Sequence, residues 1–273
     1  NKDAPNFKIL KSNKLGNNLE DLNIVINHDE NIYINDTLLV NDNLVLEVRK
    51  LGLPEITIHN LSSLESFDIE FEENAYDVSL SNNFEITNDN FNYQYSSLTT
   101  PKSIINFNIS NKESENLLTK EVVGFDKSKY ELDRFFISAR DNEKIPVVTV
   151  ARKDTNLNNA PILFYGYGSY GINIDAQFRE SLIPLLNRGF VFAIINIRGG
   201  GEMGKEWYEN GRMFNKMNTF YDFNDGVKEV LKLGIGNPDN VFARGGSAGG
   251  LLMGAIINLE PDLYKGILSG VPF

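Results

Sequence analysis

One run of small residues could perform nucleophilic chemistry. It is Gly245-Gly246-Ser247-Ala248-Gly249-Gly250, which contains the pattern Gly-x-Ser-x-Gly. A nucleophilic serine is presented on a sharp, strained turn, and glycine neighbours let that turn close. An apolar run (Val241 to Ala243) precedes the turn, and a helix-like run (Leu251 to Ile257) follows it. Strand, turn and helix are the context of a nucleophile elbow, so Ser247 is predicted to be a serine-hydrolase nucleophile.

A second glycine-rich segment could stabilise the oxyanion that forms when a serine attacks a carbonyl. Tyr165-Gly166-Tyr167-Gly168-Ser169-Tyr170-Gly171 directly follows the apolar run Pro161 to Phe164. In the α/β-hydrolase plan one oxyanion donor is the N–H after the nucleophile, here that of Ala248. The second donor comes from the loop after the third strand, and a tyrosine hydroxyl on this loop could supply it.

The chain offers no clear candidate for the base that a serine nucleophile needs. Its only histidines, His28 and His59, precede Ser247 in a β-rich region and are expected to be ordinary strand or surface residues. A hydrolase triad runs Ser, Asp, His, and Asp262 follows the turn too closely to stand on a later strand loop. Only 26 residues follow Ser247. We therefore expect a serine hydrolase cut short after its nucleophile and inactive as an isolated chain.

A competing interpretation concerns Gly199-Gly200-Gly201-Glu202-Met203-Gly204, which matches Gly-x-Gly-x-x-Gly after a strand-like run. Asp222 lies near the distance at which a dinucleotide site places its ribose-binding acid. That acid should end a second strand, however, and Asp222 sits in a helix-like run. Glu202 would also bring negative charge to a pyrophosphate. A dinucleotide site is therefore not expected.

Composition limits the remaining functions. The 273 residues are 41% apolar and 23% charged, as in soluble globular proteins of one or two domains. The formal net charge of −11 disfavours nucleic acid and is compatible with cationic substrates. No apolar run approaches the roughly 18 residues of a bilayer span, so no membrane partner is expected. The lack of cysteine fits a cytoplasmic location, and no cluster has metal-ligand spacing, so neither metal nor cofactor is expected.

Two regions of different patterning must position these residues. Residues 1–115 contain β-rich runs between Asn, Asp and Gly clusters, which indicates an antiparallel sandwich or a few propeller blades. The predicted strands are 23–27, 31–34, 44–48, 55–59, 66–71, 83–87, 92–97 and 104–109.

Residues 116–273 alternate apolar strands with helices, which indicates a mostly parallel sheet covered on both faces. The predicted strands are 130–139, 146–151, 161–165, 190–198, 241–243 and 266–271. The predicted helices are 175–188, 219–233 and 248–258, and a polar stretch at 111–120 precedes the first of these strands.

Taken in order, the glycine-rich motifs resemble the prolyl oligopeptidase family. The similarity rests on 165–171, on Arg-Gly-Gly-Gly-Glu at 198–202 and on 245–250. Tyr95-Ser96-Ser97-Leu98-Thr99-Thr100-Pro101 also resembles a segment at the end of the propeller in the oligopeptidase B branch of that family. The resemblance implies the last blades of a seven-bladed β-propeller at 1–115. It implies a truncated α/β-hydrolase peptidase domain at 116–273.

The resemblance also implies catalytic roles. Ser247 would be the nucleophile, and the Tyr167 hydroxyl and the Ala248 N–H would form the oxyanion hole. Tyr170 and Phe273 would line the pocket for the residue before the scissile bond. The triad aspartate and histidine, and the glutamates that read arginine or lysine, would follow Phe273.

Asp175 would help to bind a basic residue one position further upstream in the substrate. The oligopeptidase B branch carries Asp-Ala-Asp here, whereas this chain has Asp175-Ala176-Gln177, so a preference for paired basic residues is weakened. The alternative role for Asp175 is that of an acid at a helix N-terminus, where the macrodipole favours it.

Two functions are compatible with these patterns. The first is a serine oligopeptidase that cleaves short basic peptides after Arg or Lys through an acyl-enzyme on Ser247, completed by a C-terminal complementing chain. The second is a non-catalytic split or decayed remnant that acts as a binding or assembly fragment.

Overall fold

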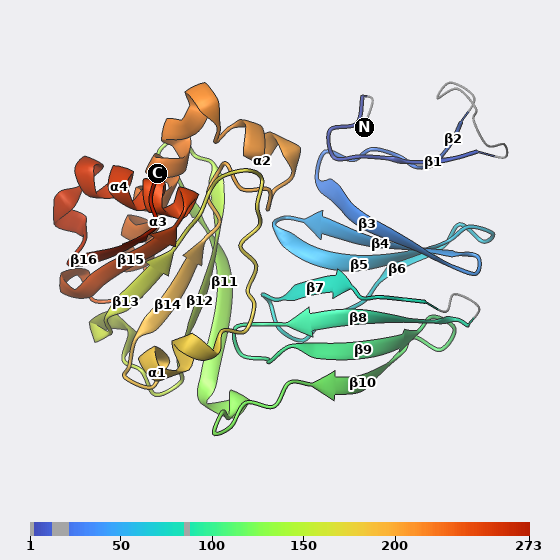
Figure 1. Ribbon diagram of the computed structural model, residues 1–273, viewed down its shortest axis with the longest axis horizontal. Helices are drawn as coiled ribbons and strands as arrows, with labels where there is room; N and C mark the ends of the chain where they lie inside the picture. The colour runs from blue at the N-terminus through green and yellow to red at the C-terminus, as the bar shows by residue number, and fades with distance from the viewer. Residues whose placement is uncertain (1–2, 13–21, 85–87) are drawn as a thin grey trace.

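The computed structural model describes residues 3–12, 22–84 and 88–273, which form a β-rich N-terminal part and an α/β C-terminal part (Figure 1). The N-terminal part consists of antiparallel sheets. A two-stranded sheet pairs β1 (Ile9–Lys11) with β2 (Asn23–Ile26). The first four-stranded sheet contains β3 (Ile32–Val40), β4 (Asn43–Lys50), β5 (Leu53–Asn60) and β6 (Ser66–Asp68). The second contains β7 (Asp77–Leu80), β8 (Asn90–Ser96), β9 (Ser103–Asn108) and β10 (Glu113–Thr119).

The two four-stranded sheets share one hydrophobic core. Strand residues alternate between faces, so Ile56 and Ile58 of β5 point to one side, and Phe91 and Tyr93 of β8 meet them from the other sheet. All four side chains are buried. This stacking of short antiparallel sheets is the packing that neighbouring propeller blades use.

Two differences from the predicted strands occur in this part. The polar stretch 111–120 was not predicted to contain a strand, but Glu113–Thr119 forms β10 at the edge of the second sheet. All seven of its residues are exposed, so no apolar face marks it as a strand in the sequence. The strand expected at 83–87 lies partly outside the described residues, and Asn83 and Phe84 are not in a strand.

The C-terminal part contains a six-stranded sheet in the order β11-β12-β14-β13-β15-β16. Strands β11 and β12 are antiparallel, whereas β14, β13, β15 and β16 run parallel. The strands are β11 (Tyr130–Ser138), β12 (Lys144–Arg152), β13 (Ile162–Tyr165), β14 (Val191–Ile195), β15 (Val241–Gly246) and β16 (Gly266–Gly270). The α-helices are α1 (Ile183–Leu186), α2 (Lys205–Glu209), α3 (Lys216–Lys232) and α4 (Ala248–Leu259).

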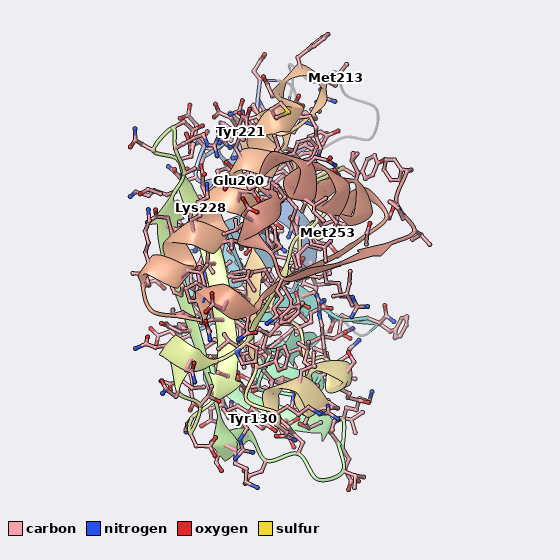
Figure 2. All side chains as sticks on the ribbon, turned by 90° about the vertical axis from the view of Figure 1, so that its left-hand side faces the viewer. Tyr130, Met213, Tyr221, Lys228, Met253 and Glu260 are labelled. Carbon is pink, nitrogen blue, oxygen red and sulfur yellow. The ribbon has the colours of Figure 1, made fainter. Side chains whose placement is uncertain are left out.

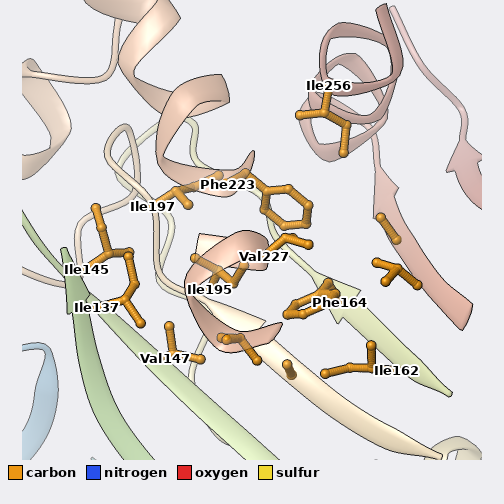
Figure 3. Close-up of a cluster of buried hydrophobic side chains, with 14 of the residues drawn as sticks. Ile137, Ile145, Val147, Ile162, Phe164, Ile195, Ile197, Phe223, Val227 and Ile256 are labelled. Carbon is orange, nitrogen blue, oxygen red and sulfur yellow. The ribbon is translucent and has the colours of Figure 1, made fainter. Parts of the chain in front are cut away.

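The sheet is covered on both faces. On one face, Phe223 and Val227 of α3 and Ile256 of α4 pack against Phe164 and Ile195 of the strands (Figure 3). The two helices are also linked beyond the core, because Lys228 Nζ donates a 2.6 Å hydrogen bond to Glu260 (Figure 2). In the described part of the chain no helix is long and apolar enough to cross a membrane.

The other face of the sheet packs on α1 and on the propeller-like N-terminal part, which is called the propeller below. Leu186 of α1 joins Ala75 and Leu98 of the propeller in a cluster with Val150 and Ile194 of the sheet. The propeller therefore contributes directly to the hydrophobic core of the C-terminal part.

The helix expected at 175–188 was largely wrong. Only a 3₁₀ turn at Glu180–Leu182 and the single turn of α1 form there, and the residues before Glu180 are not helical. The polar groups of 175–178 bond to the propeller instead of closing helical turns, as described below.

Candidate active site

Ser247 occupies a strained turn between β15 and α4. Its backbone angles are φ 56° and ψ −120°, a left-handed φ that is costly for a residue other than glycine. The turn is fastened on both sides: Ser247 N–H donates to Gly270 O at 2.9 Å, and Gly250 N–H donates to Ser247 O at 2.8 Å. A Cβ on Gly245 would collide with Gly249 O, so a larger residue there would prevent closure. The exposed serine is thus presented as a nucleophile elbow requires.

The Tyr165–Gly171 loop lies against the start of α4. A Cβ placed on Gly249 would lie 2.9 Å from Gly166 O and 3.5 Å from Tyr167 Cδ2. Ala248 is the first residue of α4, so its N–H has no partner one turn earlier and is free to donate to an anion. The structure thus brings Ser247, Ala248 and Tyr167 together at one helix N-terminus.

The glycines of 199–201 serve close packing of one backbone on another. Gly171 N–H donates to Gly199 O at 3.0 Å, and a Cβ on Gly199 would collide with Gly168 O. A Cβ on Gly201 would lie 2.5 Å from Gly171 O. The space that a pyrophosphate would need is therefore filled by the Tyr165–Gly171 loop itself.

Asp222 of α3 anchors the start of the 198–204 loop through Arg198. Its side chain is fully buried, and its carboxylate accepts from Arg198 Nε at 2.8 Å and from Arg198 N–H at 3.0 Å. A second acid, Asp141, lies 2.7 Å from Arg198 Nη1. Asp222 is therefore committed to a buried ion pair inside a helix, and it does not end a second strand.

Glu202, in the 198–204 loop, is a buried acid. Its Oε1 accepts from Ile174 N–H at 2.9 Å and from Asn196 Nδ2 at 3.1 Å. Its Oε2 has no partner among the described residues. Burial raises the pKa of Glu202 to about 7, because the charged form has lost its hydration.

Asp175 faces the propeller. Arg49 of β4 donates to both of its carboxylate oxygens, Nη1 to Oδ1 at 2.9 Å and Nη2 to Oδ2 at 2.5 Å. The side chains of Arg49 and Asp175 are 4% and 12% exposed, so the pair is nearly dry. Gln177 also bonds to the propeller, through Asp77 at 2.8 Å.

Tyr170 and Phe273 are both exposed. Tyr170 has a left-handed φ of 61° in the loop that carries Tyr167. Phe273 follows Pro272, whose Cα would lie 2.9 Å from a Cβ on Gly250. Both residues therefore belong to segments that contact the start of α4 beside Ser247, as an edge of a substrate pocket would.

The Tyr95–Pro101 segment is bound to Glu73 within the propeller and, through Ser96, to the C-terminal part. Glu73 accepts hydrogen bonds from the hydroxyls of Tyr95, Thr99 and Thr100. Although burial opposes the charge, these bonds hold the pKa of Glu73 below its usual value. The hydroxyl of Ser96 accepts from Phe178 N–H at 3.0 Å.

His28 and His59 line a cavity of about 370 Å³ within the propeller sheets. They are the only two histidines of the chain, and the cavity they line is formed by residues 26–68, away from the Ser247 turn. Across residues 3–12, 22–84 and 88–273, no group of three His, Cys, Asp or Glu side chains could hold a metal ion.

Comparison with known proteins identifies the family. Residues 1–120 match the prolyl oligopeptidase N-terminal β-propeller domain, and residues 176–273 match the prolyl oligopeptidase family. Dipeptidyl aminopeptidase BI of Pseudoxanthomonas mexicana is 39% identical over 272 residues, which are 99% of this chain and 38% of that protein. The chain belongs to the prolyl oligopeptidase family.

Solved structures of the family have the same fold. A structure from a study of two prolyl endopeptidases gives a TM-score of 0.90 at 30% identity, over 99% of this chain and 40% of that one. Oligopeptidase B from Leishmania major gives a TM-score of 0.84 at 35% identity, over 92% of this chain and 36% of that one. The chain therefore spans about two fifths of the length of these relatives, as propeller-like sheets followed by a mixed, mostly parallel α/β sheet.

The sequence patterns did not indicate three residues near the site. Arg49 pairs with an acid 126 positions away, so no local pattern could reveal it. Glu202 was considered only as an obstacle to a nucleotide. Lys216 hydrogen-bonds to the Tyr165–Gly171 loop. Its only signal in the sequence is a lysine at the start of a helix, a position where the helix dipole disfavours a cation.

Proposed function

We propose that this chain carries the nucleophile and oxyanion hole of a serine peptidase that cleaves short peptides after arginine or lysine. Ser247 attacks the scissile carbonyl and forms an acyl-enzyme, while Ala248 N–H and the Tyr167 hydroxyl stabilise the oxyanion. A histidine outside these 273 residues acts as the base. Short basic peptides and a C-terminal complementing segment are thus the proposed partners, in the cytoplasm.

The observation that carries this proposal is the strained φ of Ser247 at the N-terminus of α4, beside the Tyr167 loop. Backbone strain at an exposed polar residue is retained where geometry matters for chemistry. The preference for basic residues is supported by the similarity to oligopeptidase B and by the net charge of −11. The names of the relatives also include a dipeptidyl aminopeptidase and prolyl endopeptidases, so specificity needs a direct test.

A chimera tests the proposal. This chain replaces the matched segment of Leishmania major oligopeptidase B, and hydrolysis of arginyl, lysyl and prolyl peptide amides is measured. We expect cleavage after Arg and Lys, loss of activity to background in Ser247→Ala, and a reduction of kcat by about 10²-fold in Tyr167→Phe. The isolated chain should show no more than a trace of activity, because it lacks its base.

Undiminished turnover in Ser247→Ala would refute the assignment of the nucleophile. The parent supplies the residues after Phe273 in this chimera, so the basic specificity is tested on this chain joined to its own continuation, where preferential cleavage after proline would refute it. The alternative function is a non-catalytic binding or assembly fragment. It would be supported by a chimera that melts cooperatively yet hydrolyses none of the three substrates.

A further inference from the structure

Lys216 reaches from α3 to the loop that carries Tyr167. Its Nζ donates to Gly168 O at 2.6 Å and to Ser169 Oγ at 2.7 Å. Gly168 also packs closely against α3, because a Cβ placed on Gly168 would lie 2.5 Å from Cγ2 of Thr219, one turn after Lys216. The N-terminus of α3 thus holds the loop by polar and steric contacts immediately after Tyr167.

The placement of Lys216 is unfavourable for a lysine in three ways. It is the first residue of α3, where the helix dipole opposes a positive charge. Within the described part of the chain, no carboxylate lies within 4.0 Å of Nζ to form a salt bridge. Burial lowers the pKa of Lys216 to about 8 because the ammonium has lost much of its hydration.

The loop that Lys216 contacts contains several residues with left-handed backbone conformations. Gly168, Tyr170 and Gly171 all have left-handed φ values, 64°, 61° and 65°. Such a loop keeps one conformation only if its surroundings enforce it. Two short hydrogen bonds from a single ammonium, one of them to the carbonyl directly after Tyr167, are well suited to this task.

We propose that Lys216 is a positioning residue for the oxyanion hole: it fixes the loop so that the Tyr167 hydroxyl faces the carbonyl attacked by Ser247. This inference rests on the proposed function. Lys216 acts through the loop and through Tyr167. Its removal should therefore lower kcat more than it raises KM, because the affected interaction is made in the transition state.

The test uses the chimera described above, with Lys216→Met, Lys216→Arg, Ser169→Ala and the control Lys232→Met. Lys232 lies on the same helix and is exposed and paired with Glu229. Its replacement therefore makes the same Lys→Met substitution at a position that does not contact the loop. We expect Lys216→Met to lower kcat by about 10–100-fold with KM changed less than about 3-fold, as for a small misplacement of a catalytic group. Lys216→Arg, which keeps donors and charge, should stay within about 5-fold of the parent, and so should Ser169→Ala, which leaves the Gly168 carbonyl bond.

A double variant decides whether Lys216 acts through Tyr167. In a Tyr167→Phe background, Lys216→Met should lower kcat less than about 3-fold further, because the group that it positions is already absent. Equal effects of Lys216→Met and Lys232→Met, or full additivity with Tyr167→Phe, would overturn the inference. Hydrogen exchange of residues 165–171 in the isolated chain is a second readout: it should accelerate in Lys216→Met, and unchanged exchange would also overturn it. Activity that survives Ser247→Ala would instead defeat the proposed function.

Discussion

At the scale of residues, the backbone geometry of the Ser247 turn depends on which atoms a side chain at each neighbouring glycine would meet. Gly245 and Gly246 are neighbours in the same motif, yet their surroundings differ. A Cβ on Gly245 would collide with the backbone oxygen of Gly249, whereas on Gly246 the nearest atom is Gly270 O at 3.8 Å. Only the first glycine is therefore required by the geometry of the elbow.

This difference predicts unequal effects of one methyl group. Gly245→Ala should lower the free energy of unfolding by about 2–3 kcal/mol, because the colliding atom is backbone and cannot rotate away. Gly246→Ala should change it by less than about 0.5 kcal/mol. Urea unfolding of the 273-residue chain measures both values, and similar losses at the two positions would contradict the geometry.

At the scale of elements, β16 is the edge strand of the six-stranded sheet. It pairs with β15 and has no second neighbour among the described strands. Its apolar residue Leu268 is 53% exposed, and Val271 just beyond it is 82% exposed. An open, apolar strand edge is a template for pairing with another chain.

The isolated chain is therefore expected to self-associate through β16. Leu268→Lys should shift the chain toward monomer, because a charge on an edge strand opposes pairing between sheets. The control is Leu233→Lys at a comparably exposed position after α3 (61% exposed). Size-exclusion chromatography with light scattering measures the mass. A wild-type chain that is already monodisperse and monomeric would disprove the expectation.

At the scale of the whole molecule, ion pairs connect the propeller to the α/β part, and these pairs differ in how deeply they are buried. The Arg49–Asp175 pair is nearly dry, whereas the side chains of Lys120 and Glu180, which also join the two parts, are 62% and 52% exposed. Burial decides the strength of such pairs, since removal of one partner from a dry pair leaves an uncompensated charge. Exposed pairs contribute little.

Two double-mutant cycles test this difference. Arg49→Met and Asp175→Asn should each destabilise the chain by about 3 kcal/mol, and the double variant by less than the sum, with a coupling of about 1–3 kcal/mol. The cycle of Lys120→Met and Glu180→Gln should give a coupling below about 1 kcal/mol. Denaturant unfolding of the wild-type chain and the six variants measures both couplings; equal values would show that the dry pair does not hold the two parts together.

The sequence by itself determined the features whose cause is local. The elbow around Ser247 could be predicted because a strained turn between a strand and a helix needs small neighbours within a few positions. The parallel sheet could be predicted because strands buried on both faces are apolar throughout, as Val191–Ile195 is. The Tyr165–Gly171 loop could be placed beside the elbow because both follow parallel strands and so emerge at the same sheet edge.

The tertiary structure decided whatever depends on distant partners. Residues 175–188 look helical in sequence, but Arg49 and Asp77 from the propeller engage their polar groups, and these bonds replace helical turns. Strand β10 has no apolar face, so only its pairing with β9 makes it a strand. Lys216 is one lysine among many until the fold places Gly168 O within hydrogen-bond distance. Local patterns record local constraints, whereas the contacts of Asp175 and Lys216 are imposed by atoms 126 and 48 positions away along the chain. Strand β10 is fixed by backbone pairing with its neighbour β9, which its side-chain pattern does not reveal.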